Sequence, residues 1–74
     1  MDNYNKEYNF WLSFYRNENY NFYKALGKSH NDIIEHYKKE LKEHEDTLCL
    51  FKGHKDYNSK LGAINAYKTI LETL

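Results

Sequence analysis

The sequence predicts an all-α protein, a small helical bundle of three helices in a single domain over residues 1–74. Three observations lead to this fold class. Apolar residues recur at intervals of three and four along most of the chain, which is the spacing of one helix face. The chain contains no proline and no valine, so it lacks a helix breaker and a strong strand former. Gly27 and Gly53 divide it into three segments of helix length.

The first helix is expected over about residues 4–26. Its apolar stripe comprises Tyr4, Tyr8, Trp11, Tyr15, Phe22 and Leu26. Glu18 and Asn19 interrupt this stripe. A β-hairpin is the alternative, with strands at 10–15 and 20–23 on either side of the polar residues 17–19. Strict alternation of apolar and polar residues fails in both halves, so we favour the helix.

The second helix is expected over about 30–52. Ser29 is a suitable N-cap, and Asp32 follows three residues later, where a carboxylate interacts well with the helix start. A seam with a period of seven runs through Ile34, Tyr37, Leu41, His44, Leu48 and Phe51. This pattern is typical of a helix that packs along its whole length.

The third helix is expected over about 56–73, with Asp56 as its cap. One face carries Tyr57, Leu61, Ile64 and Leu71, and a second face carries Ala63, Ile70 and Leu74. Gly62, Ala63 and Ala66 are small enough to let a neighbouring helix approach closely. The connection at 52–55 is short, so the second and third helices should form an antiparallel C-terminal helical hairpin.

These patterns also predict which side chains form the core. The expected core comprises Tyr8, Trp11, Tyr15, Phe22, Leu26, Ile34, Tyr37, Leu41, Leu48, Leu61, Ile64 and Leu71.

Charge and composition narrow the function classes. Eleven basic residues balance eleven acidic ones, and Arg16 is the only arginine, which argues against nucleic acid as a partner. The longest apolar runs are too short for a membrane span, and no secretory signal is expected. Cys49 is the only cysteine, which is typical of a reducing compartment, and we expect a cytoplasmic protein.

A helix-turn-helix is one motif to consider. Residues 25–29 with Ile33 resemble the turn of that DNA-binding motif, in which a glycine makes the turn. Tyr23 stands where the motif has a small residue, and His36 where it has an aliphatic one. An ordinary helix connection with a glycine C-cap is the simpler interpretation. A helical nucleic-acid-binding regulator with a degenerate motif around Gly27 remains the alternative function.

Catalytic and metal sites are not indicated. His36, Glu40 and His44 line one helix face, but three ligands on one helix rarely converge on one ion. Cys49 lies among apolar neighbours, as inert core thiols do. No phosphate loop or paired-carboxylate motif is present. We therefore expect no enzymatic activity, no cofactor and no metal.

A protein partner is the favoured interpretation, because apolar residues remain outside the predicted core faces. These candidate interface residues are Phe10, Tyr20, Leu50, Ile70 and Leu74. Exposed apolar area usually marks an interaction surface, and aromatic residues are common interface anchors. The partner would be another protein, the chain itself as a homodimer, or both.

The closing stretch from Leu61 to Leu71, after a long charged helix and a short loop, resembles the ends of small helical-hairpin proteins carried by bacteriophages. The resemblance covers about the last 45 residues. It implies an accessory protein that binds one host or phage protein, as a stoichiometric inhibitor, for example of host defence, or as an assembly factor. It assigns no functional residue.

Overall fold

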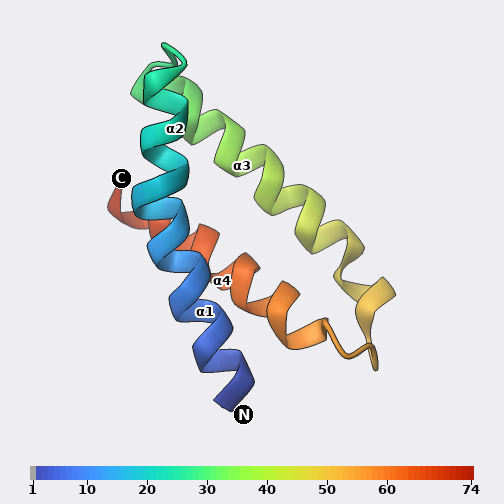
Figure 1. Cartoon of the computed structure of the whole chain (residues 1–74). Helices are drawn as coiled ribbons and strands as arrows, with labels where there is room; N and C mark the ends of the chain where they lie inside the picture. The colour runs from blue at the N-terminus through green and yellow to red at the C-terminus, as the bar shows by residue number, and fades with distance from the viewer. Residues whose placement is uncertain (1) are drawn as a thin grey trace.

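A computed structural model describes residues 2–74 and arranges them as three helical rods (Figure 1). The elements are α1 (Asp2–Phe14), the π-helical turn η1 (Tyr15–Asn19), α2 (Tyr20–Ala25), α3 (His30–Thr47), the 3-10 turn η2 (Leu48–Phe51) and α4 (Tyr57–Thr73). The first three form one continuous rod, and α3 with η2 forms the second. No strand occurs in residues 2–74. The all-α prediction is confirmed, and the β-hairpin alternative is wrong.

The turn between α2 and α3 is defined by local chemistry. Gly27 has a φ of +88°, a conformation that glycine adopts without steric cost. The Lys28 amide donates to the Tyr23 carbonyl at 3.1 Å, and the Gly27 amide donates to the Lys24 carbonyl at 3.0 Å. This is the Schellman pattern of helix ends. Ser29 then caps α3 as predicted: its Oγ accepts from the Asp32 amide, and the Asp32 carboxylate accepts from the Ser29 amide.

The second turn reverses the chain after η2. Gly53 has a φ of +81°, and the His54 amide donates to the Phe51 carbonyl at 2.8 Å. From this turn α4 runs back along α3, which gives the predicted antiparallel hairpin (Figure 1).

The main partner of α4, however, is α1. Gly62 lies so close to α1 that a Cβ there would be 2.9 Å from the Tyr8 backbone nitrogen. Polar side chains tie the same two helices together: Tyr8 Oη lies 2.9 Å from Thr69 Oγ1, and Ser59 Oγ donates to Glu7 Oε1 at 2.9 Å. The prediction that small residues in this helix admit a close neighbour is confirmed.

The π turn changes which residues of the first rod face inward. A π-helical turn takes about one residue more than an α-helical turn. The inward-facing residues are therefore Tyr15, Asn19 and Tyr23, and two turns of the rod take eight residues here. In an unbroken α-helix two turns take about seven residues, so Phe22 would face inward instead of Tyr23. Phe22 and Leu26 consequently become largely exposed. Their predicted place in the core is wrong.

The inner face of α3 begins at Ile33, one residue before the predicted Ile34, and the predicted Tyr37 lies on it. Ile33 is 1% exposed and Tyr37 is fully buried, whereas the predicted Ile34 is only half-buried. On α4, residues of both predicted faces are buried because the helix lies between α1 and α3. The buried apolar residues are Tyr15, Ile33, Tyr37, Ala63, Ile64, Ala66, Tyr67 and Ile70.

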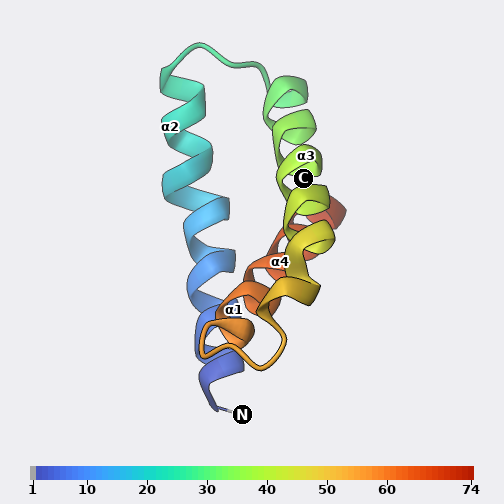
Figure 2. The same cartoon turned by 90° about the vertical axis from the view of Figure 1, so that its right-hand side faces the viewer.

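The two long rods meet at the Gly27 turn, and α4 passes between their other ends (Figures 1 and 2). Along α2 the contact between the rods is sparse. The arrangement leaves room between the rods for the groove described next.

Candidate functional site

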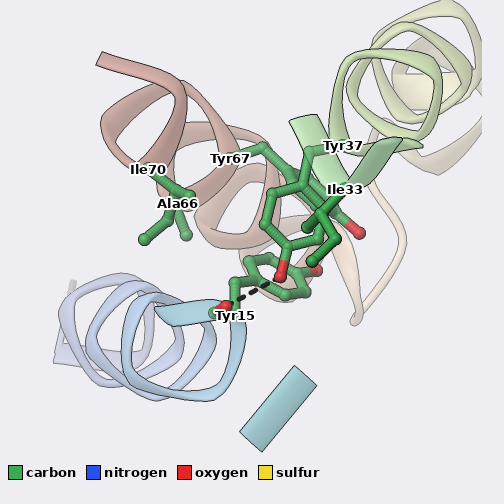
Figure 3. Close-up of a cluster of buried hydrophobic side chains, with 6 residues drawn as sticks. All are labelled: Tyr15, Ile33, Tyr37, Ala66, Tyr67 and Ile70. Atoms are coloured by element: carbon green, nitrogen blue, oxygen red, sulfur yellow. Dashed lines mark hydrogen bonds between the residues drawn. The ribbon is translucent and has the colours of Figure 1, made fainter. Parts of the chain in front are cut away.

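Three tyrosines from three different helices form the centre of the core beneath the site. Figure 3 shows Tyr15 of η1, Tyr37 of α3 and Tyr67 of α4 converging at the centre of the core. The rings of Tyr15 and Tyr67 stack with centroids 4.0 Å apart. The Tyr37 hydroxyl donates to the backbone carbonyl of Tyr15 at 2.8 Å and accepts from Asn19 Nδ2 at 3.4 Å. The π turn is thus fastened to α3 by a buried hydrogen bond.

A groove of about 460 Å³ opens above Tyr15 and Tyr67. Pockets that hold small ligands typically measure about 300–1,000 Å³, so its volume lies in that range. The first rod supplies an aromatic wall, which consists of Trp11, Phe14, Tyr15 and Tyr23. Trp11 stacks on Tyr15 with centroids 5.6 Å apart and meets Phe14 edge to face. The indole N–H of Trp11 is buried and has no hydrogen-bond partner among the described residues.

The opposite wall is polar and comes from one face of α3. It consists of His36, Glu40 and His44, spaced four residues apart. His36 Nε2 lies 2.9 Å from the Tyr23 hydroxyl, which connects the two walls across the groove. His44 Nδ1 lies 3.0 Å from Lys60 Nζ. Glu40, between the two histidines, is half-buried and forms no ion pair or side-chain hydrogen bond within residues 4–74.

The lower end of the groove is closed by residues near the second turn. Lys60 lies over the Phe51 ring, with Nζ 4.8 Å from the ring centroid, which is a cation–π distance. Ser59 and Asp56 complete this end.

Burial dominates the acid–base properties of the site. It raises the pKa of Tyr15 and Tyr67, and the negative charge of Glu40 adds to both shifts. It raises the pKa of Tyr37 to about 12. Burial, together with the positive charge of Lys60, lowers the pKa of His44 below its ordinary value of 6.5. His44 is therefore neutral at pH 7 and can accept a hydrogen bond from the Lys60 ammonium.

The histidines and Glu40 do not assemble a metal site. Among residues 2–74, no three side chains of His, Cys, Asp or Glu lie close enough together to hold an ion. Their distribution along the groove wall explains this, because each histidine turns to a different partner.

An apolar edge borders the groove on the first rod. We define it as Phe10, Phe14, Phe22 and Leu26. Phe14 and Phe22 each precede by one residue a tyrosine that lines the groove, so they lie on the same flank of the rod, with the exposed Glu18 between them. Phe10 stacks on Phe14 with centroids 6.2 Å apart. Phe10 and Phe22 are each 57% exposed, and Leu26 is equally open.

The five predicted interface residues are placed as follows. Phe10 lies on the apolar edge, and Leu50, on η2, is 75% exposed. Leu74 is exposed at the end of the chain. Tyr20 is half-buried, with its hydroxyl 2.8 Å from His30 Nδ1.

Ile70 is fully buried, so its assignment to the surface is wrong. It packs in the core cluster with Tyr15, Ile33 and Tyr67. Cys49, expected to be an inert core thiol, is exposed instead.

Sequence reasoning missed most of the groove. Phe14, Tyr23 and Lys60 carried no signal of their own, and Phe22 and Leu26 were assigned to the core. The one available signal was the face of α3 that carries His36, Glu40 and His44, which is polar where a packed helix would be apolar.

No helix within residues 2–74 has the length and apolar character that crossing a membrane requires. No family model, curated protein or solved structure matches the chain.

Proposed function

We propose that the protein is a non-enzymatic protein-binding module whose docking surface is the groove together with the apolar edge. The observation that carries this proposal is the exposure of Phe10 and Phe22 on the flank of the rod that also walls the groove. Exposed apolar side chains that continue into a groove are typical of interaction surfaces. Binding would act by occlusion or scaffolding, in the manner of a stoichiometric inhibitor or an assembly factor.

The apolar edge gives this surface an anchor region. Phenylalanine contributes a large contact area when it is buried on binding, and interface cores are rich in aromatic residues. The groove beside it supplies a polar wall that can fix the orientation of a partner. The apolar edge and, across the groove, the polar wall of α3 together provide apolar contact area and polar groups, as protein interfaces typically do.

The first test replaces the two exposed aromatics of the edge. A double variant, Phe10→Asp with Phe22→Asp, should stay folded because both side chains are largely exposed. Tagged wild-type protein should capture one protein at about equal amounts from cells of its source, and the double variant should lose it. Asn9→Asp with Asn21→Asp, at exposed positions of the same rod, adds the same charge outside the edge and should retain the partner.

The same experiment separates the alternatives. A complex anchored by apolar side chains should persist between about 50 and 200 mM salt, whereas a nucleic-acid complex should weaken steeply by counterion release. Steep loss with salt, or equal capture by both double variants, would contradict the proposal.

Light scattering over a concentration series tests self-association. If the wild type is a dimer and the Phe10→Asp, Phe22→Asp variant is a monomer, the partner of this surface is a second copy of the chain. A monomer at all concentrations leaves a different protein as the partner.

A further inference from the structure

Glu40 is the unusual charge of the groove. Its side chain is half-buried opposite an aromatic wall, yet it has no ion pair within the described residues. A carboxylate removed from water loses hydration that only a partner charge or hydrogen-bond donors restore. The nearest basic residue lining the groove, Lys60, is held at the end of the groove by His44 and Phe51. The carboxylate of Glu40 is therefore available to form an ion pair with a cation from another molecule.

The wall facing Glu40 is also suited to a cation. Aromatic faces attract positive charge through their quadrupole, and the attraction grows when water is excluded. Trp11 and Tyr23 supply the aromatic surface of the groove across from Glu40, whereas the ring of Tyr15 is covered by Tyr67 and Trp11. Lys60 already demonstrates this chemistry at the end of the groove, where its ammonium lies over Phe51.

We infer that the groove receives an arginine side chain of the protein partner, with its guanidinium between the carboxylate of Glu40 and the aromatic wall. This inference rests on the proposed function and specifies the chemistry of its partner. Arginine matches the site better than lysine does, since its planar group stacks on aromatic rings and forms two parallel hydrogen bonds to one carboxylate. The apolar edge then packs against the residues that flank this arginine.

The positive charge of Lys60 repels an incoming cation, so a variant at Lys60 provides a second test. It donates to neutral His44, one helical turn from Glu40, and forms no ion pair with Glu40. Replacing Lys60 with methionine retains the apolar stem against Phe51 and removes the like charge. Arginine binding should then strengthen.

A small probe tests the groove without the partner. N-acetyl-arginine amide is titrated into the full chain, and binding is followed by the emission of Trp11, the only tryptophan, and by amide chemical shifts along α3. The matching citrulline probe has the same shape without the charge. The matching lysine probe, acetylated on its α-nitrogen, has the charge without the planar group. We expect the arginine probe to bind about tenfold more tightly than the citrulline probe. The lysine probe should bind more weakly than the arginine probe.

Variants assign the effect to the residue. Glu40→Gln should reduce arginine binding to about the citrulline level, whereas Glu43→Gln, which removes the same charge from an exposed position of α3, should not change it. Lys60→Met should strengthen binding. Equal binding of arginine and citrulline, tighter binding of lysine than arginine, or equal effects of the two glutamate variants would overturn the inference.

The two proposals fail in different ways. If the arginine probe does not bind but the apolar edge still captures its partner, only the arginine assignment falls. If the probe binds at Glu40 but no partner depends on Phe10 and Phe22, the docking function falls.

Discussion

Tyr37 joins α3 to the π turn through its hydroxyl, which donates to the Tyr15 carbonyl in a fully buried position. A π turn leaves its carbonyls differently placed from those of an α-helix, and here one of them finds a side-chain donor from another helix. The aromatic ring of Tyr37 fills the core, while its single polar atom specifies the shape of the neighbouring rod.

Tyr37→Phe should lower the free energy of unfolding by about 1–3 kcal/mol, because the Tyr15 carbonyl would stay buried without its donor. Urea denaturation measures the change. Tyr57→Phe is the matched control: Tyr57 is half-buried and forms no side-chain hydrogen bond among the described residues, so its hydroxyl should contribute little. Equal losses in the two variants would show that the hydrogen bond does not stabilise the turn.

His44 should make stability depend on pH. Burial and Lys60 lower its pKa in the folded state, so the unfolded chain binds the proton first as the pH falls through about 6.5. The stabilisation is present above that pH and decreases as the pH falls towards the folded-state pKa. Unfolding measured at about pH 7.5 and about pH 5 should show this loss in the wild type.

The His44→Gln variant should lose less stability than the wild type over the same pH interval. His54→Gln removes a histidine from an exposed position of the second turn and is the variant with which His44→Gln is compared. The idea fails if removing His44 leaves the pH dependence unchanged.

At the scale of the elements, local chemistry explains why the helices could be predicted and their faces could not. Caps and turns depend on neighbouring residues, and Ser29, Asp32 and Gly27 behave as their types predict. The inward face of the first rod depends on a hydrogen bond between residues 22 positions apart. The interruption at Glu18 and Asn19 marked the place of the π turn, but not the shift by one residue that follows from it.

The crossing of α1 and α4 depends on Gly62. In an exposed helix, replacing glycine with alanine stabilises by about 1 kcal/mol. At Gly62 the added Cβ would meet backbone atoms of α1, so Gly62→Ala should destabilise by about 1–3 kcal/mol. Thermal and urea unfolding provide the measurement.

The exposed Lys68 serves as the reference position on the same helix, since Lys68→Ala and Lys68→Gly differ only in intrinsic helix preference. Alanine should be the more stable residue there. If Gly62→Ala shows the same gain, the two helices do not approach as closely as described.

For the whole molecule, stability is unevenly distributed. The close packing lies between α1 and α4, while α2 contains no buried residue and contacts α3 sparsely. The sequence predicts three helices of the right lengths, but apolar periodicity does not tell which pair packs closely and which pair stands apart. The groove exists because α1 and α4 pack closely while α2 and α3 stand apart, so its lining residues could not be predicted as a group from the sequence.

Native-state hydrogen exchange should reveal this distribution. Amides of α2 should exchange through local opening at lower free energy than those of the second half of α1, because few buried contacts oppose the opening. Uniform protection along the rod would contradict this description. The Tyr37→Phe variant should widen the difference, since it removes the hydrogen bond that joins the π turn to α3.

The π turn also determines how the chain would tolerate the deletion of one residue. A helix with such a turn contains one residue more than the α-helix that would join the same ends, so losing a single codon within residues 15–19 would convert it into a regular helix. Tyr23 would then lie seven residues after Tyr15, which is two α-helical turns, so Tyr23 would still face inward and Phe22 and Leu26 would stay on the surface. One in-frame deletion thus yields a regular helix that still displays Phe22 and Leu26, and related chains of either length should present the same apolar edge.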